Sequence, residues 1–251
     1  MDRILYTAMS GARQSMEQQA VVSHNLANAS TSGFRAQLQA MRAVPVQGDG
    51  RLDTRASVAA TTPGADFSPG PMNRTGRTLD VAMQGDAWLA VQAPDGSEAY
   101  TRRGDLQVDG DGLLRSAGRP VIGEGGPIQV PLGAELSMGS DGTLSAIAPG
   151  QNADGLVTVG RLKLVTPGEG GLTRGEDGLF RGPVNQDGVP GALPADEDAT
   201  LVSGALEGSN VNPVDAMVSM IDVARRYEMQ TKVMSTVDEN AQRADRLLSM
   251  N

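Results

Sequence analysis

The chain has 251 residues, no cysteine, and a net charge of −9, from 21 Lys and Arg against 30 Asp and Glu. An acidic chain is a poor ligand for nucleic acid or an anionic membrane surface, because both need clustered basic residues. The lack of cysteine excludes disulfides and thiolate chemistry, and no apolar run approaches the roughly 18 residues that span a bilayer, so we expect no insertion into a membrane.

The N-terminal stretch is predicted to form a helix from about Arg3 to Ala29. Apolar or small residues recur at spacings of three and four, at Leu5, Ala8, Ala12, Met16, Gln19, Val22, Leu26 and Ala29. The mean spacing is close to the ~3.5 residues of a heptad seam, which favours partners in other helices or other chains. The stretch becomes polar too early for a secretory signal, so we expect no cleaved signal peptide.

The helical pattern stops inside residues 25–34, which read NLANASTSGF. We expect Gly33 to take a positive φ at the helix C-terminus and Phe34 to pack back on the last turn. Side chains that can bond to the open carbonyls of that turn are those of Asn25, Asn28, Ser30, Thr31 and Ser32.

The middle of the chain is predicted to be β. Of the 32 glycines and 14 prolines, 29 and 13 lie in 36–207, and Asp-Gly, a strong hairpin signal, occurs eight times in the chain. We expect hairpins at 88–102 and 136–147 and a strand at 156–165 with a bulge at Gly160. Residues 36–78 are interpreted as an extended, turn-rich linker, and 79–207 as the β domain.

A second long helix is predicted after Asn212, which is a favourable N-cap before Pro213 at the first helical position. Its expected seam is Met217, Ile221, Ala224, Tyr227, Thr231, Met234, Val237, Ala241, Ala244 and Leu248. Two helices with the same period at opposite ends of a chain favour antiparallel pairing. The predicted class is α+β, with residues 1–35 and 208–251 forming a coiled-coil-like inner domain beside a mostly β middle domain.

Motifs for chemistry are scarce. No P-loop, G-x-S-x-G or H-E-x-x-H pattern occurs. The lone His24 cannot form a two-histidine metal site. The DGDG run at 109–112 lacks a calcium loop's fifth ligand, at Leu113, and its final glutamate, at Pro120. We therefore expect no enzyme activity, no cofactor and no metal.

Two motifs resemble the rod and hook family of axial flagellar proteins. Its N-terminal pattern, N-L-A-N-x-x-T-x-G-F, is matched from Asn25 to Phe34, and residues 75–114 look like the start of the family's β domain. Its C-terminal pattern is matched at Ser209, Asn210, Val211, Asn212, Met220, Ile221, Arg225, Tyr227, Glu228 and Lys232. Ala224-Arg225 stands where distal-rod and hook proteins usually carry Gln-Arg, which favours a proximal-rod member.

The resemblance implies a structural subunit of the proximal rod, whose terminal helices form the inner layer of a torque-transmitting tube. Its implied partners are copies of itself, other rod proteins and the flagellar export apparatus, without a small-molecule substrate, and its implied location is the basal body crossing the periplasm. The expected interface residues are Asn25, Leu26, Asn28, Thr31, Gly33, Phe34, Asn210, Asn212, Met217, Ile221, Arg225, Tyr227, Glu228 and Met234. The alternatives are a distal-rod protein, a secreted β-domain binding module with helical arms, and a carbohydrate-active enzyme.

Overall fold

The computed structural model describes residues 2–45, 56–148, 150, 155–168, 171–185 and 190–248. The class is α+β, as predicted: an N-terminal helix, a mostly β middle and a C-terminal helix. The chain divides into two compact units. Unit 1 comprises Met1–Ala29, Ala36–Asp66 and Val211–Asn251, and unit 2 comprises Ser30–Arg35 and Phe67–Asn210.

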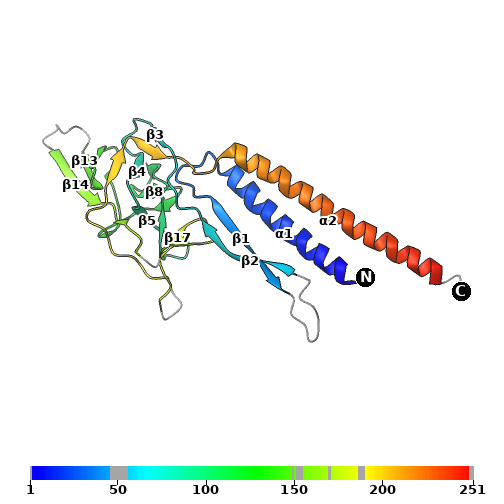
Figure 1. The fold of residues 1–251 in the computed structure, drawn as a ribbon. Coiled ribbons are helices and arrows are strands. Elements are labelled where there is room, and N and C mark those ends of the chain that lie inside the picture. Colours follow the sequence, from blue (N-terminus) through cyan, green and yellow to red (C-terminus); the bar gives the residue numbers. More distant parts are fainter. Residues whose placement is uncertain are drawn as a thin grey trace. The chain divides into compact units, whose positions relative to one another are not determined.

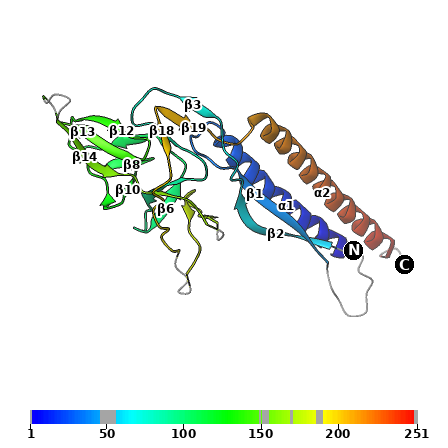
Figure 2. The ribbon, with the colours of Figure 1, turned by 60° about the vertical axis from the view of Figure 1, so that its left-hand side comes forward.

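Unit 1 contains both helices, α1 (Asp2–Ala27) and α2 (Pro213–Leu248). They pack side by side and run antiparallel, so that the start of α1 and the end of α2 lie at the same end of the pair (Figures 1 and 2). The predicted N-cap is confirmed, because the Val214 N–H donates to Asn212 Oδ1 at 3.0 Å. Neither helix, nor any other in the described part of the chain, is long and apolar enough to cross a membrane.

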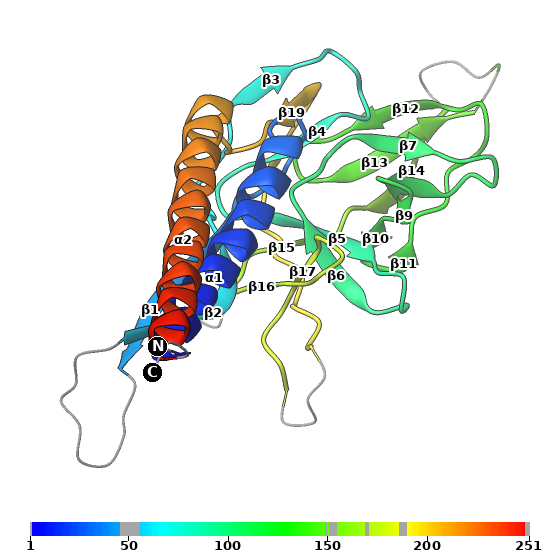
Figure 3. The same ribbon diagram turned by 90° about the vertical axis from the view of Figure 1, so that its right-hand side faces the viewer.

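A β-ribbon completes unit 1. Strands β1 (Gln37–Pro45) and β2 (Ala56–Ala65) pair antiparallel, from Gln37 opposite Ala65 to Pro45 opposite Ala56. Both strands contact α1, and the ribbon runs beside that helix in Figure 3. The structure therefore differs from the expected linker at 36–78: much of it is a ribbon that belongs with the helices. Residues 36–66 of this stretch fall in unit 1, and residues 67–78 fall in unit 2 together with residues 30–35.

Unit 2 is built from short antiparallel strands in several small sheets. The largest has five strands in the order β15-β5-β6-β17-β16, and another has the order β12-β13-β14. The strands are β3 (Met72–Arg74), β4 (Val81–Met83), β5 (Trp88–Gln92), β6 (Glu98–Thr101), β7 (Leu106–Val108), β8 (Leu114–Ser116), β9 (Arg119–Pro120), β10 (Ile122–Gly123), β11 (Gly126–Pro127), β12 (Glu135–Met138), β13 (Thr143–Ile147), β14 (Leu156–Arg161), β15 (Leu164–Val165), β16 (Thr173–Arg174), β17 (Phe180–Arg181), β18 (Leu201–Ser203) and β19 (Ala205–Glu207).

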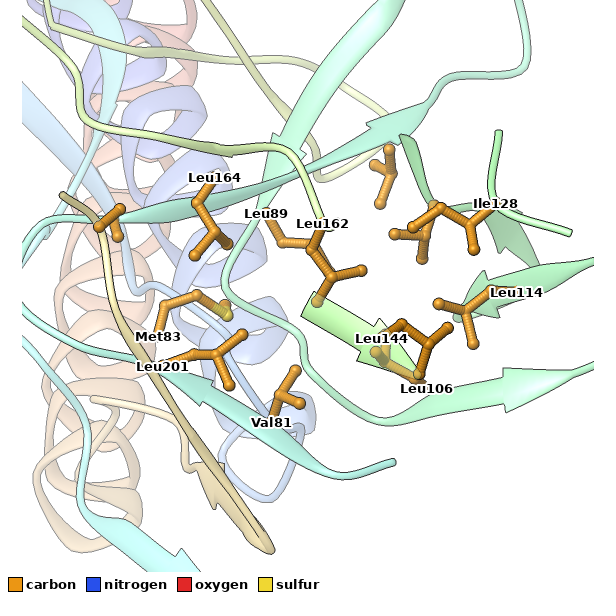
Figure 4. Packing of buried hydrophobic residues seen from close by; sticks show 14 of the residues in the cluster. Val81, Met83, Leu89, Leu106, Leu114, Ile128, Leu144, Leu162, Leu164 and Leu201 are labelled. Atoms are coloured by element: carbon orange, nitrogen blue, oxygen red, sulfur yellow. The ribbon is translucent and has the colours of Figure 1, made fainter. Parts of the chain in front are cut away.

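The two predicted hairpins are confirmed as β5–β6 and β12–β13. A bulge lies one residue before the predicted position: Leu144 faces Gly160 and Ser145 faces Thr158, which leaves Val159 as the extra residue. The core between the sheets is aliphatic, with Leu89, Leu106 and Leu144 fully buried (Figure 4). At ~1.5–3 kcal/mol for each fully buried aliphatic side chain, this core gives unit 2 its own source of stability.

Candidate assembly site

The end of α1 is bonded to the start of the ribbon by one side chain. The amide of Asn25 makes two hydrogen bonds with the backbone of Gln37: Nδ2 donates to the Gln37 oxygen at 2.9 Å, and Oδ1 accepts from the Gln37 N–H at 2.8 Å. This paired geometry copies a β-ladder contact. Asn25 therefore fixes the first residue of β1 against the last turn of the helix.

The last turn of α1 closes as the amide-rich sequence suggested. The Asn28 N–H donates to His24 and Asn25 carbonyls at 3.2 and 3.1 Å, and the Ala29 N–H donates to the Leu26 carbonyl at 3.2 Å. The Asn28 side chain also donates to the His24 carbonyl, at 2.9 Å. A side chain thus helps to satisfy carbonyls that a helix end leaves open.

Gly33 has the predicted positive φ, 65°, but it does not cap α1, which ends six residues earlier. A Cβ on Gly33 would lie 2.3 Å from the carbonyl carbon of Arg102 and 2.4 Å from the Arg103 nitrogen. The Gly33 N–H donates to the Glu207 main-chain oxygen at 2.7 Å. Glycine is required here because the backbone lies directly against the backbone of Arg102 and Arg103.

Phe34 belongs to unit 2, where the Arg174 guanidinium lies 5.0 Å from its ring centroid. The Thr31 carbonyl accepts from the Phe34 N–H at 3.3 Å, and the Phe34 carbonyl accepts from the Asn210 N–H at 3.4 Å. The Asn210 side chain donates to the Ser68 carbonyl at 3.1 Å. The two sequence motifs, 176 positions apart at Phe34 and Asn210, therefore meet in unit 2.

A buried ion triad lies beside this meeting point. Glu207 Oε1 accepts from Arg35 Nη2 at 2.6 Å and Oε2 accepts from Arg102 Nε at 2.7 Å. All three side chains are at most 4% exposed. Both guanidinium carbons also lie within 6 Å of the Trp88 ring centroid, at 5.9 and 5.8 Å, a range suited to cation–π attraction.

The charge state of Glu207 follows from these neighbours. Burial alone raises the pKa of a carboxyl group, but the charges and hydrogen bonds of Arg102 and Arg35 outweigh it and hold the pKa of Glu207 below its ordinary value. The ionised carboxylate also accepts the Gly70 N–H at 2.9 Å. Breaking a buried, hydrogen-bonded pair by removing one partner typically costs about 3–5 kcal/mol, so the triad is a major constraint on this part of unit 2.

One face of α2 packs on α1. The less exposed side chains recur at near-heptad spacing, at Ala216, Met220, Val223, Gln230, Thr231, Met234, Val237 and Ala241. Ser15 on α1 donates to Gln230 Oε1 at 3.2 Å. The second half of this α1-facing row agrees with the predicted seam. Its first half is displaced by one residue, from the predicted Met217 and Ile221 to Ala216 and Met220.

The opposite face of α2 also carries exposed apolar side chains, most densely in its first turns. At ~100° per residue, Val214, Met217, Val218 and Ile221 point roughly away from the α1-facing residues, and they are 64, 52, 55 and 54% exposed. Met229 and Val233 extend the exposed set, and α1 carries its own in Leu5, Tyr6, Met9 and Met16. Of the other expected interface residues on α2, Arg225 and Glu228 are exposed, Tyr227 is 38% exposed and Met234 is half-buried.

Features of a catalytic site are sparse in the described residues. They contain no group of three His, Cys, Asp or Glu side chains able to hold a metal ion. The DGDG turn is occupied by its own contacts, since Asp109 Oδ1 accepts N–H bonds from Asp111 and Leu113 and its Oδ2 pairs with Arg115. A cavity of about 600 Å³ in unit 2 is lined by Trp88 and Phe67 and by the ion triad.

The ion triad is not apparent from the amino-acid sequence. Arg35 and Glu207 are 172 positions apart, and nothing in the sequence pairs them. The available signal was local: Arg35 directly follows the N-terminal motif, and Glu207 ends the apolar run of β19 just before the C-terminal one. Charged residues next to recurrent motifs were candidates for a buried pair.

Three family models match the chain. The model described as "Flagella basal body rod protein" matches residues 5–35, and "Flagellar hook protein FlgE/F/G D1 domain" matches 82–146. The model described as "Flagellar basal body rod FlgEFG protein C-terminal" matches 202–247. The matched stretches thus include both helices and the β domain.

Full-length relatives agree with these models. The chain is 57% identical to the flagellar basal-body rod protein FlgF of Escherichia coli (strain K12) and 55% identical to that of Salmonella typhimurium (strain LT2), with 100% of each chain covered. It is 32% identical to the rod protein FlgG of Bacillus subtilis (strain 168), over 95% of this chain and 96% of that protein. The chain therefore belongs to the FlgF family of flagellar basal-body rod proteins.

Proposed function

We propose that this structural rod subunit builds the proximal part of the rod, with α1 and α2 in a coiled-coil-like inner layer of a torque-transmitting tube and unit 2 in its outer layer. The observation that carries this proposal is the exposed apolar face of α2, from Val214 to Val233. A helix that carries apolar side chains on two sides is suited to a position between other helices. One face is covered by α1, and neighbouring subunits would cover the other.

The helix pair by itself is weakly packed, which supports the same role. Among the described helix side chains, the buried apolar ones are Ala12 and Val223, while Gln14 and Ser15 are buried polar residues. Gln14 Nε2 and Gln19 Oε1 have no hydrogen-bond partner among the described residues. Each such buried atom costs about 1–3 kcal/mol, so the pair gains stability when other helices join it.

The partners of this assembly are copies of the same chain and other rod proteins, a family with structural rather than enzymatic members. Nucleic acid, a small-molecule substrate and membrane insertion have no place in it. The subunit travels through the flagellar export apparatus without a cleaved signal and resides in the rod where it crosses the periplasm. N-terminal sequencing of the subunit from isolated basal bodies tests the export claim: a sequence starting beyond the first turn of α1 would contradict it.

Engineered disulfides test the assembly claim, because the chain has no cysteine of its own. Met9→Cys and Ile221→Cys place thiols on exposed helix faces, 56 and 54% exposed. Mild oxidation of basal bodies carrying both changes should give disulfide-linked chains, and the purified monomer should give few. Leu132→Cys, 60% exposed in unit 2, is the matched control. Equal linking through Leu132→Cys, or none through the helices, would contradict an inner helical layer.

A further inference from the structure

Glu207 is the residue on which separate stretches of unit 2 converge. Its main-chain oxygen accepts from Gly33 at 2.7 Å. Its Oε1 accepts from Arg35 at 2.6 Å and from the Gly70 N–H at 2.9 Å, and its Oε2 accepts from Arg102 at 2.7 Å. A single residue near the C-terminal end of unit 2 thus supplies three acceptor atoms to three stretches that precede it in the chain.

These stretches differ in how firmly unit 2 holds them. Arg102 also donates to the main-chain oxygens of Met83, Gly85 and Ala87, at 3.1, 2.8 and 2.5 Å, which fixes it to the end of β4 and to the turn that leads into β5. Segment 30–35 has six residues and forms no strand. Two of those residues, Gly33 and Arg35, bond to Glu207, and Arg174 and Asn210 add bonds to the main-chain oxygens of Arg35 and Phe34, at 3.1 and 3.4 Å. Glu207 thus supplies the buried ion pair of the segment and the acceptor for its Gly33 N–H.

Strand β19 is itself fixed independently of segment 30–35. It pairs antiparallel with β3, with Glu207 opposite Met72 and Ala205 opposite Arg74. The following Gly208 N–H donates to the Pro71 oxygen at 2.8 Å. Glu207 therefore has a firm position on the β domain from which it can bind the N-terminal segment.

We propose that Glu207 is a latch: its carboxylate and main-chain oxygen together seat segment 30–35 on unit 2, so that this N-terminal segment becomes ordered only once β19 is in place. The two ends of unit 2 then order in one step. The latch goes beyond the proposed assembly role, because it acts within a single chain and would operate in the monomer.

Hydrogen exchange of the full chain tests the latch residue by residue. Glu207→Gln should accelerate exchange of the Gly33 and Gly70 amides at least ten-fold. The Ala90 amide, which donates to the Lys163 oxygen at 3.0 Å in the core sheet, should keep its rate. Equal acceleration at Gly33 and Ala90 would show a general loss of stability and overturn the latch, as would unchanged exchange at Gly33.

A second variant keeps the test decisive if Glu207→Gln does not fold. Arg35→Met leaves Arg102 to neutralise Glu207 and should accelerate Gly33 exchange at least ten-fold by itself. Where both variants fold, the double variant should exchange at Gly33 no faster than the faster single variant, since both changes release the same segment. Multiplying effects would overturn the latch.

Glu98→Gln is the matched control. Glu98 is also a partly buried carboxylate of unit 2, paired with Lys163 at 2.8 Å and accepting from the Tyr100 hydroxyl at 2.8 Å, and both of these partners lie outside segment 30–35. Its loss should leave the Gly33 amide unchanged. Acceleration at Gly33 as large as in Glu207→Gln would show that any lost ion pair loosens the segment, and the latch would be rejected.

Discussion

The substitution Ile221→Asp tests whether the exposed face of α2 has a role different from that of the face that packs on α1. Ile221 is 54% exposed on the face turned away from α1, whereas Val223, two residues on, is 1% exposed on the face that packs against it. If the exposed face binds neighbouring subunits, Ile221→Asp should leave the fold of the monomer intact and prevent its incorporation into the rod. Val223→Asp should instead disrupt the pairing of α1 and α2 within one chain.

The expected loss of association free energy can be worked out from the exposed fraction of Ile221. Fully burying an isoleucine is worth ~1.5–3 kcal/mol, so covering the exposed half of Ile221 contributes roughly 1 kcal/mol. Six similarly exposed side chains, from Val214 to Val233, then contribute roughly 6 kcal/mol per subunit. An unpaired carboxylate in that interface costs several kcal/mol more, which offsets most of this gain and weakens association by roughly 100-fold or more.

Swimming assays, with the subunit quantified by immunoblot in purified basal bodies, measure the effect. Asp222→Ala, one residue along the helix, should be incorporated normally. Circular dichroism should show the same spectrum for the parent monomer and for Ile221→Asp, and reduced helix for Val223→Asp. Normal incorporation of Ile221→Asp at normal expression would refute the reasoning and leave the exposed face without an assembly role.

Gly33→Val introduces two costs: a β-branched residue at a positive φ, with about 1–3 kcal/mol of strain, and a Cβ placed 2.3 Å from the Arg102 backbone. The melting temperature of unit 2 should therefore fall by roughly 6–12 °C. Gly76→Val is the control, at φ 75° with no atom within 4 Å, and an equal fall there would show that φ alone is responsible. Brief proteolysis of the monomer should remove the weakly packed helices and leave a fragment that starts no later than Phe67 and ends near Asn210, as read by mass spectrometry; a fragment that starts near Leu79 would contradict the unit boundary. The pKa of Glu207 in the folded protein lies below its ordinary value of 4.5. Its ion pairs therefore stabilise unit 2 fully above that value and are lost as the pH falls through the lower folded pKa. The stability of Glu207→Gln should accordingly depend less on pH than that of the parent below about pH 4.5, and parallel acid-unfolding curves would contradict this.

Local signals were sufficient for the elements with strong start and stop patterns. The adjacent residues Asn212 and Pro213 predict the start of α2, and the hydrogen bond expected for the N-cap is present. The Asp-Gly turns likewise predict β12–β13, because turn chemistry is local. The seam of α2 was displaced in its first turns since Met217 and Ile221 are as apolar as Met220 and Val223, and a periodicity alone cannot say which of two apolar faces is covered.

Contacts between distant stretches could not be read in this way. The ribbon β1–β2 has no clean alternation of apolar and polar residues, and Pro63 and Gly64 in its second strand argue against a strand by propensity. Its pairing depends on tertiary context. The positive φ of Gly33 was predicted, but its neighbour, the Arg102 backbone, lies 69 positions away in the sequence, so its role was assigned to the helix end instead.

The division of the chain into three stretches of unit 1 around unit 2 sets the order in which a growing polypeptide can fold. Every residue of unit 2 has been synthesised once Asn210 is reached, whereas α1 is made first and still waits for residues 211–251 before its partner helix exists. Contacts between such distant stretches form slowly, because a long loop must close before they are gained. All of unit 2 is therefore available for folding before α1 can meet its partner helix, and α1 spends most of synthesis unpaired.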